Sequence, residues 1–236
     1  MNIAVIFAGG RGNRFAFDGL PKQFVEVNGK PIVVHTIERF NECEYIDKIV
    51  VVCLDGWIDH MRYLVDKYML NKVESVVVGG PTSQASIHNG LLEVKSICKE
   101  ENAIVLIHDG VRPILTQQLI KDNIDSVIKY GSAITVGEIT ETPLRVENDC
   151  VVEVFPREQG RIAKAPQSFW LNDILNAHEE AIARGELNYL DSCSLMKAVD
   201  FSLHYIDCFR WNIKVTIPSD LTIVKAFLDM KNKGEK

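Results

Sequence analysis

The chain has 236 residues, of which 47% are hydrophobic, and a formal net charge of −6 at pH 7. This length and apolar content fit one large domain or two small ones with a sizeable core, and the negative charge argues against a nucleic-acid partner, because general nucleic-acid binders are usually basic. No apolar run reaches the roughly 18 residues that a membrane-spanning helix needs, and the N-terminus lacks the features of a signal peptide, so we expect a cytoplasmic protein with no membrane partner.

Apolar runs alternate with helix-length amphipathic stretches over the first 139 residues. The apolar runs predict buried strands at 2–7, 48–54, 73–79, 103–108 and 132–139. The stretches between them predict helices at 31–41, 57–69, 83–97 and 116–129. Continuous β-branched strands separated by helices indicate a parallel sheet that is covered on both faces. We therefore expect an α/β fold with a Rossmann-like, doubly wound, mostly parallel sheet.

The pattern changes at 140–170, where short strand-like pieces flank an Asn148-Asp149 turn. We interpret this region as a β-hairpin arm, at about 138–162, that projects from the sheet; an antiparallel edge hairpin of the same sheet is the alternative. The remaining patterns predict a strand at 162–169, helices at 171–184 and 191–199, a strand at 202–207, and a last helix that starts near Pro218. Neither a repeat nor a linker interrupts the chain, so residues 1–236 are expected to form one domain.

The loop after the first strand carries glycines and then cations. Gly9, Gly10 and Gly12 are followed by Arg14 and Lys22. In an open parallel sheet, ligands bind beyond the carboxyl ends of the strands. Glycines there let backbone N–H groups approach a phosphate, and nearby cations add to its binding. The spacing matches neither a Walker A loop nor the dinucleotide fingerprint, so we interpret it as another kind of phosphate-binding loop, with a simple tight turn as the alternative.

The segment LIHDGVRP (106–113) ends the fourth strand at the same edge of the sheet. Asp109 suits a magnesium ion or its waters, because hard cations take oxygen ligands. Arg112 would contact a phosphate or orient Asp109, and a structural ion pair between the two is the alternative. His108 is expected to be packed at the strand end and not to be a ligand.

Two more segments carry polar residues beside apolar ones. Lys214 lies in NIKVTI, a predicted short strand, so its side chain must point to water or to an anion, and the sequence leaves both open. The segment VGGPTSQAS (78–86) is a glycine loop that opens a helix, with Ser83 as the expected N-cap. The sequence does not decide whether Ser86 has a role in the helix start or contacts a nucleotide base or ribose.

Six segments stand in the order in which sugar-alcohol-phosphate cytidylyltransferases carry them: FAGGRGNR, LPKQF, VGGPTSQAS, HDGVRP, APQSF and NIKVTIPSDL. The chain resembles this family over residues 2 to about 230. LPKQF, PIVVHTIERF and DSCSL resemble the ribitol-5-phosphate branch more than the 2-C-methyl-D-erythritol 4-phosphate branch.

The resemblance implies a nucleotidyltransferase that joins CTP to a polyol phosphate, D-ribitol 5-phosphate first, and releases pyrophosphate. The product, CDP-ribitol, would be a precursor of a cell-surface polysaccharide or teichoic acid. The alternatives are 2-C-methyl-D-erythritol 4-phosphate cytidylyltransferase of isoprenoid synthesis, or the same reaction on another alditol phosphate. Mg²⁺ is the implied cofactor.

The resemblance also implies roles for the matching positions. The nucleotide would be bound by Ala8, Gly9, Gly10, Gly12, Gly80, Ser86 and Asp109. The catalytic cations would be Arg14, Lys22 and Lys214. The polyol phosphate would be bound by Arg112, Thr142 and Arg157. In the family the last two lie on an arm that reaches the neighbouring subunit, which implies a homodimer with composite sites, and Asp109 would serve the magnesium ion.

Two positions depart from the family pattern. Ala165 stands where a threonine is common, which leaves the acceptor open, and Pro81 stands where an aspartate is common, which leaves the nucleotide preference open. Two other classes of protein fit the sequence less well. An NAD-dependent oxidoreductase is disfavoured because Phe15 occupies the third glycine position of its fingerprint. A non-catalytic nucleotide sensor would not need both Arg14 and Lys22.

Overall fold

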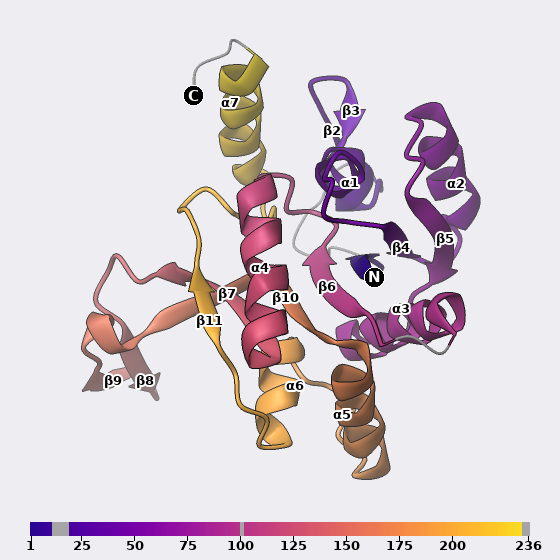
Figure 1. The fold of residues 1–236 in the computed structure, drawn as a ribbon. Helices are drawn as coiled ribbons and strands as arrows, with labels where there is room; N and C mark the ends of the chain where they lie inside the picture. The colour runs from indigo at the N-terminus through magenta and orange to yellow at the C-terminus, as the bar shows by residue number, and fades with distance from the viewer. Residues whose placement is uncertain (11–18, 100–101, 233–236) are drawn as a thin grey trace.

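A computed structural model describes residues 1–10, 19–99 and 102–232 of the chain. Its central element is a seven-stranded sheet (Figure 1). The strands of this sheet are β1 (Asn2–Ala8), β4 (Lys48–Cys53), β5 (Val73–Val78), β6 (Ile104–Asp109), β7 (Ser132–Glu138), β10 (Arg161–Trp170) and β11 (Tyr205–Asp207). The helices are α1 (Ile32–Asn41), α2 (Ile58–Lys67), α3 (Ser83–Cys98), α4 (Gln117–Tyr130), α5 (Leu171–Ala183), α6 (Ser192–Ala198) and α7 (Asp220–Asn232). None of the helices in the described part of the chain is long and apolar enough to cross a membrane.

The strand order is β11-β7-β10-β6-β1-β4-β5. Strands β6, β1, β4 and β5 are parallel neighbours, β11 is parallel to β7, and β10 runs antiparallel to both β6 and β7. The prediction of a doubly wound, mostly parallel sheet is therefore confirmed, with β10 as its antiparallel member.

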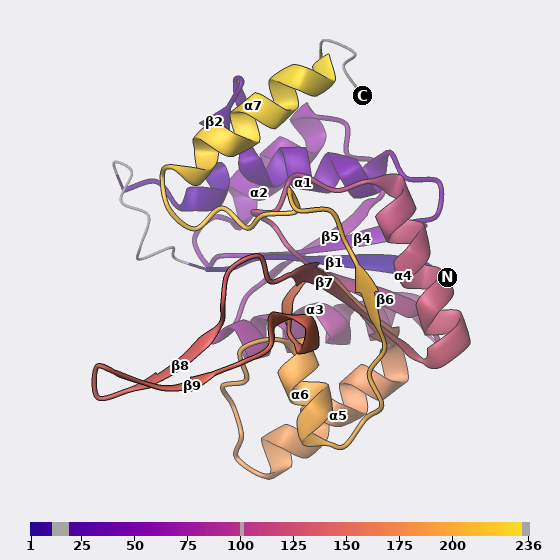
Figure 2. The same cartoon turned by 90° about the vertical axis from the view of Figure 1, so that its left-hand side faces the viewer.

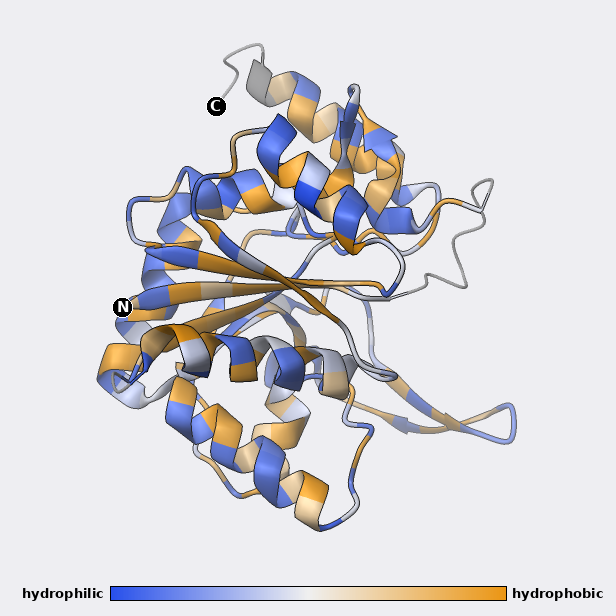
Figure 3. Cartoon of the chain, turned by 90° about the vertical axis from the view of Figure 1, so that its right-hand side faces the viewer, coloured by the Kyte–Doolittle hydropathy of each residue, from blue (hydrophilic) through white to orange (hydrophobic). Residues whose placement is uncertain are grey.

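Both faces of the sheet are buried, which explains why its strands are continuous apolar runs. Alternate side chains of β1 point to opposite faces. Ala4 and Ile6 join the cluster formed with α1, α2 and α4, whereas Ile3 and Val5 join the cluster formed with α3, α5 and α6. Figure 2 shows these two helical layers on either side of the sheet, and Figure 3 shows the apolar strands between amphipathic helices.

The arm is a separate two-stranded sheet, β8 (Leu144–Glu147) and β9 (Cys150–Val154), and not an edge of the main sheet. Its turn residues Asn148 and Asp149 both have positive φ, of 49° and 63°. Asn and Asp tolerate this left-handed conformation, which a two-residue hairpin turn of matching twist requires. Figure 2 shows the arm extending away from the helical layers.

A third apolar cluster lies outside the two sheet faces. It joins α7 to a small hairpin, β2 (Glu26–Val27) and β3 (Lys30–Pro31), that the sequence pattern did not reveal. Val27 from the hairpin, Val224 from α7 and Val215 from the preceding segment are all buried in this cluster. The hairpin follows a 3₁₀ turn at Lys22–Phe24, so the cluster packs the segment of Lys22 against the segment of Lys214.

One local prediction is wrong. Residues 212–216 form no strand; within the described residues, their backbone hydrogen bond to the body of the protein is from Val215 N to Val111 O, at 2.9 Å. The last helix begins at Asp220, close to Pro218 as predicted, and the Asp220 carboxylate accepts hydrogen bonds from the N–H groups of Thr216 and Ile217.

Candidate active site

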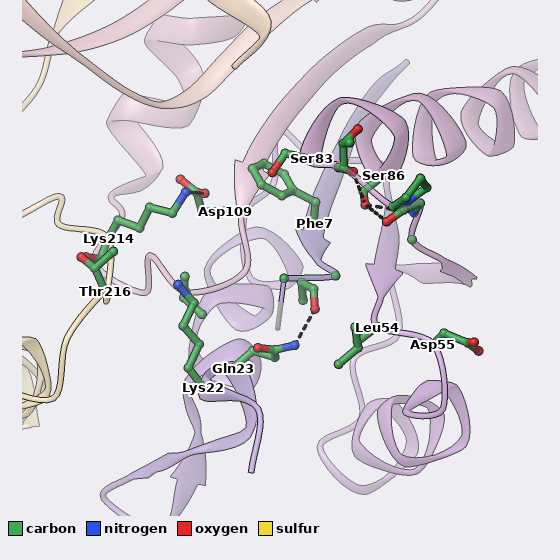
Figure 4. A pocket seen from close by; sticks show the side chains of 18 residues that line it. Phe7, Lys22, Gln23, Leu54, Asp55, Ser83, Ser86, Asp109, Lys214 and Thr216 are labelled. Carbon is green, nitrogen blue, oxygen red and sulfur yellow. Dashed lines mark hydrogen bonds and ion pairs between the residues drawn. The ribbon is translucent and has the colours of Figure 1, made fainter. Parts of the chain in front are cut away.

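A cavity of about 740 Å³ opens at the carboxyl ends of β1, β4, β5 and β6 (Figure 4). This is the edge where ligands bind in open α/β sheets, and the volume is in the range of small-molecule sites. The described residues that line it are Phe7, Ala8, Gly9, Gly10, Lys22, Gln23, Leu54, Asp55, Gly79, Gly80, Pro81, Thr82, Ser83, Ser86, Asp109, Val111, Lys214 and Thr216. Six segments that are distant in sequence therefore meet at one edge of the sheet, and five of them carry the motifs singled out in the sequence.

The loop after β1 forms the floor of the cavity through Ala8, Gly9 and Gly10. The buried Gln23 amide donates a hydrogen bond to the Ala8 carbonyl at 2.7 Å and so fixes where this loop leaves the strand. Lys22 precedes Gln23, and its Nζ donates a hydrogen bond to the Val215 carbonyl at 3.2 Å. The predicted site residues Gly12 and Arg14 lie outside the described residues.

Ser86 organises the glycine loop after β5. Its hydroxyl accepts a hydrogen bond from Gly80 N at 3.0 Å and donates one to the Thr82 carbonyl at 2.9 Å. A Cβ on Gly80 would lie 2.5 Å from the Ala85 Cβ, so only glycine fits there. Gly9 also packs here, because a Cβ on it would be 3.3 Å from the Ser86 hydroxyl. Ser86 thus joins the loops of β1 and β5.

The N-cap of α3 is Thr82 and not Ser83. The Thr82 hydroxyl accepts a hydrogen bond from Ala85 N at 3.1 Å, and its backbone is extended as an N-cap requires. Ser83 is the first residue of the helix, and its exposed side chain lines the cavity instead. The prediction failed because Thr and Ser cap helices with similar preference and stand side by side here.

Asp109 is the buried anion of the site. Its Oδ2 accepts a hydrogen bond from Arg112 Nε at 3.1 Å, and its Oδ1 lies 2.5 Å from the Lys214 ammonium. Burial alone would raise the pKa of Asp109, but the two cations outweigh burial and hold that pKa well below its usual range. The carboxylate is therefore ionised at neutral pH, and the pair of cations leaves this corner of the site with net positive charge.

Lys214 points to an anion, which answers the question that the sequence left open. Its ammonium reaches Asp109 from the irregular 212–216 segment, and Figure 4 shows it on the same side of the cavity as Lys22. Ser83 and Ser86 lie across the cavity from Lys22 in the same view. The two lysines are thus placed together against one wall, with the serine-rich start of α3 on the other.

Arg112 supports Asp109 from behind and does not itself line the cavity. It is buried, and besides Asp109 its guanidinium contacts the carbonyl of Asn212, with Nη1 2.9 Å from the oxygen. The backbone carbonyl of Arg112 lies 3.0 Å from His108 Nε2. Burial lowers the pKa of His108 to about 4, so the ring is neutral and donates this bond. His108 is packed against Phe40, as predicted for a strand-end histidine.

The two arm residues do not reach this cavity within one chain. Thr142 and Arg157 are exposed at the base of the arm, and neither lines the cavity. The Arg157 guanidinium makes an exposed ion pair with its neighbour Glu158, Nε to Oε1 3.3 Å. A single chain therefore brings together the predicted nucleotide and catalytic residues that are described, but not the two predicted arm residues.

The carboxylate side chains at the cavity determine how a divalent cation could be bound there. Over the described ranges, no group of three or more His, Cys, Asp or Glu side chains is placed to hold a metal ion. Asp109 and Asp55 are the carboxylates that line the cavity in this part of the chain. Mg²⁺ is commonly bound by one or two carboxylates together with substrate phosphates, so the ionised Asp109 fits a magnesium ion that arrives with a polyphosphate.

Two functional candidates were not found from the sequence. Gln23 and Asn212 are buried amides whose side chains bridge segments at the site. Each stands within two residues of a predicted catalytic lysine, Lys22 and Lys214. That proximity was the available signal, but an amide side chain gives no chemistry of its own until its partners are known.

Comparison with known proteins shows the family of the chain. The family described as "IspD: 2-C-methyl-D-erythritol 4-phosphate cytidylyltransferase" matches residues 2–230. A ribitol-5-phosphate cytidylyltransferase of Streptococcus agalactiae serotype V is 46% identical over 100% of this chain and 98% of its own length. One from Vibrio parahaemolyticus is 45% identical over 97% of this chain and 96% of its own.

Other relatives are named for 2-C-methyl-D-erythritol 4-phosphate as the acceptor. A 2-C-methyl-D-erythritol 4-phosphate cytidylyltransferase of Halalkalibacterium halodurans is 33% identical, with 97% of each chain covered. The crystal structure of 4-diphosphocytidyl-2C-methyl-D-erythritol synthase from Anaerococcus prevotii has a TM-score of 0.82 at 25% identity, with 97% of this chain and 96% of that chain covered. The chain is thus a nucleotidyltransferase that belongs to the IspD family of cytidylyltransferases.

Proposed function

We propose that the protein transfers the cytidylyl group of CTP to D-ribitol 5-phosphate, giving CDP-ribitol and pyrophosphate. The observation that carries this choice of acceptor is the contrast in identity over nearly full lengths: 46% and 45% to two proteins named for ribitol 5-phosphate, against 33% to one named for 2-C-methyl-D-erythritol 4-phosphate. The product is an activated alditol suited to building a cell-surface polysaccharide or teichoic acid, and the reaction would take place in the cytoplasm.

The reaction is an in-line displacement at the α-phosphorus of CTP. A phosphate oxygen of the acceptor forms the new bond to this phosphorus while the bond to the bridging oxygen of the β-phosphate breaks, and pyrophosphate leaves with that electron pair. The attacking oxygen is already ionised at neutral pH, so no general base is needed. Catalysis then rests on aligning two polyanions and neutralising their charge.

The cations of the cavity fit this task. Lys22 and Lys214 lie on one side of the site, where they would contact the triphosphate and stabilise the charge that develops on the leaving group. Lys214 would exchange part of its contact with Asp109 for the phosphates. Arg14 is expected to join them, and its position is outside the described residues. Ala8, Gly9 and Gly10 line the same space, and backbone N–H groups of this loop would bind phosphate oxygens.

Asp109 would hold Mg²⁺ together with oxygens of the triphosphate. When bound, the ion neutralises phosphate charge and stabilises the leaving pyrophosphate as a Lewis acid. Arg112 keeps Asp109 ionised and oriented; we therefore propose that Arg112 acts through Asp109 and not by direct contact with the polyol phosphate. Across the cavity, Gly80 and Ser86 would contact the cytidine.

The arm supports a homodimer. The register pairs Leu144 with Val154 and Val146 with Val151, so these side chains share one face of the hairpin, while Arg145 pairs with Glu153 on the other face. All four apolar side chains are at least half exposed. An isolated two-stranded ribbon is marginally stable in water, so this apolar face calls for a partner. A second copy would receive the arm and with it Thr142 and Arg157, which would complete the partner's acceptor site.

A pyrophosphate-release assay tests the reaction class. The purified protein is incubated with Mg²⁺, D-ribitol 5-phosphate and, in turn, CTP, UTP, ATP or GTP. We expect release with CTP to exceed the other nucleotides and to require the acceptor. Release without acceptor, or tight CTP binding with no release under any condition, would contradict the proposal and favour a hydrolase or a nucleotide sensor.

A further inference from the structure

The segment that carries Lys214 has little regular structure to hold it in place. Residues 208–219 connect β11 to α7 without a strand or helix. Trp211 and Lys214 in this segment are exposed, yet Asn212 between them is completely buried, at 0% exposure. A fully buried amide in an irregular segment needs hydrogen-bond partners for each of its polar atoms, so its contacts identify what it holds.

The contacts of Asn212 define the orientation of its side chain. Nδ2 lies 2.8 Å from the Ala165 carbonyl, which only accepts, so this atom must be the donor nitrogen. Oδ1 therefore faces Arg112, whose Nη1 lies 3.4 Å from it and 2.9 Å from the backbone oxygen of Asn212. One residue thus fastens the irregular segment to β10 on one side and to the Arg112 guanidinium on the other.

Both cations at Asp109 depend on this residue. Arg112, held through Nη1 by Asn212, presents Nε to Asp109 Oδ2 at 3.1 Å. Lys214 stands two residues after Asn212 in the same segment and presents its ammonium to Asp109 Oδ1 at 2.5 Å. Arg112 is held by the backbone oxygen of Asn212 at 2.9 Å together with the longer contact to its side-chain oxygen at 3.4 Å. Lys214 is held by the backbone, which the bond from the Asn212 side chain to Ala165 anchors.

We propose that Asn212 is a positioning residue that fixes Arg112 and Lys214 on Asp109 and thereby keeps the Asp109 carboxylate aimed into the cavity. The inference rests on the proposed function, because it assigns Asn212 to the phosphate and magnesium end of the same site. Only an amide of this size offers a donor to the Ala165 carbonyl and an acceptor to Arg112 at once. Aspartate lacks the donor and would draw Arg112 away from Asp109, and leucine lacks both groups.

The test compares Asn212→Leu with a matched variant, Asn123→Leu. Asn123 is also 0% exposed and fully hydrogen-bonded, with Nδ2 2.9 Å from the Leu119 carbonyl and Oδ1 2.8 Å from the Ser168 hydroxyl, but it belongs to α4 and does not line the cavity. Both variants lose buried hydrogen bonds, and both are expected to melt at lower temperature. Activity per folded molecule separates the two roles.

For Asn212→Leu we expect kcat to fall by about tenfold or more, with a smaller change in KM for CTP, because one preorganised electrostatic contact is commonly worth at least that much. Asn123→Leu is expected to leave both unchanged. Asn212→Ser and Asn212→Asp extend the comparison if the leucine variant does not fold.

Equal kcat in the Asn212 and Asn123 variants would overturn the proposal, while wild-type activity would show that the proposed function stands. A wild-type protein that releases no pyrophosphate would instead contradict the proposed function. In that case a crystal structure of Asn212→Leu still decides the inference: we expect Arg112 Nε and the Lys214 ammonium to move away from Asp109, and two unchanged contacts would refute the positioning role.

Discussion

At the scale of single residues, charge balance dominates the site. One buried carboxylate, Asp109, is matched by two cations, and a third cation, Lys22, stands on the same side of the cavity. The whole chain has a net charge of −6, so the positive character is local and would be missed by any sum over the sequence. A site of this kind suits phosphate ligands because its cations are already fixed before the ligand arrives.

Replacing Lys22 tests the first of these cations. Lys22→Ala is expected to lower kcat for pyrophosphate release by about 100-fold or more, since a preorganised contact to the transition state is typically worth this much. Lys121→Ala is the control, because Lys121 makes an exposed ion pair with Asp125 on α4. Near-normal turnover of the Lys22 variant at saturating CTP would exclude a catalytic role for this lysine.

Replacing Ser86 tests the loop that faces the nucleotide. Ser86→Ala removes the acceptor for Gly80 N and the donor to the Thr82 carbonyl. Loss of a buried hydrogen bond costs about 1–1.5 kcal/mol, so we expect KM for CTP to rise by about tenfold with a smaller effect on kcat. Ser126→Ala, which removes a buried hydroxyl bonded to the Ser132 carbonyl at 2.8 Å, is the matched control. Equal KM values in the two variants would argue against a nucleotide role for this loop.

At the scale of elements, the site is assembled from loops that rigid strands and one extra cluster hold in place. The carboxyl ends of β1, β4, β5 and β6 supply most of the lining residues. The segments of Lys22 and Lys214 come from outside this set, and the cluster that includes Val27, Val215 and Val224 packs them together. The arm is the one element of the described chain whose proposed role requires a second molecule.

Mixing two inactive variants tests the composite site. Lys22→Ala damages the cavity and Arg157→Ala damages the arm, so a mixed dimer retains one intact cavity that receives an intact arm. Random reassociation of equal amounts is expected to restore about a quarter of wild-type activity, as a two-fold symmetric dimer allows. Mixtures that stay inactive while sedimentation shows exchange into dimers would mean that Arg157 does not serve the partner's cavity.

Much of the fold could be predicted because its signals are local. Continuous apolar runs such as Lys48–Cys53 are buried on both faces, and the Asn148-Asp149 pair marks a turn by its own conformational preference. The segment 212–216 was mispredicted because the pattern NIKVTI is the same for an edge strand and for an extended segment held by side chains. The roles of Gln23 and Asn212 could not be predicted, because a buried amide is recognised by its partners and those come from distant parts of the chain.

At the scale of the whole molecule, buried histidines link stability to pH. Burial lowers the pKa of His35, His88, His108 and His178, to about 4 for His108 and about 3 for His178. His178 stacks on His88 between α3 and α5, with ring centroids 5.2 Å apart, and within the described residues neither of its ring nitrogens has a hydrogen-bond partner. These rings are therefore neutral in the folded protein over a pH range where the unfolded chain binds protons.

The sign of the pH effect follows from these shifts. In the unfolded chain histidine titrates near pH 6.5, so below that pH the unfolded state takes up protons that the folded state does not. The free energy of unfolding is expected to fall between pH 6.5 and about 4, by up to about 1.4 kcal/mol per pH unit for each of His108 and His178. Urea unfolding at several pH values measures this slope. His178→Phe is expected to make the slope shallower. An unchanged slope would show that His178 takes up its proton in the folded protein at the same pH as in the unfolded chain.

The identity of the acceptor is tested most directly by a competition followed by ³¹P NMR. The protein is given CTP, Mg²⁺ and equal amounts of D-ribitol 5-phosphate and 2-C-methyl-D-erythritol 4-phosphate. We expect the diphosphate resonances of CDP-ribitol to grow first and to dominate, together with those of pyrophosphate. Predominant formation of the cytidine diphosphate of methylerythritol, or consumption of neither acceptor, would contradict the proposed function.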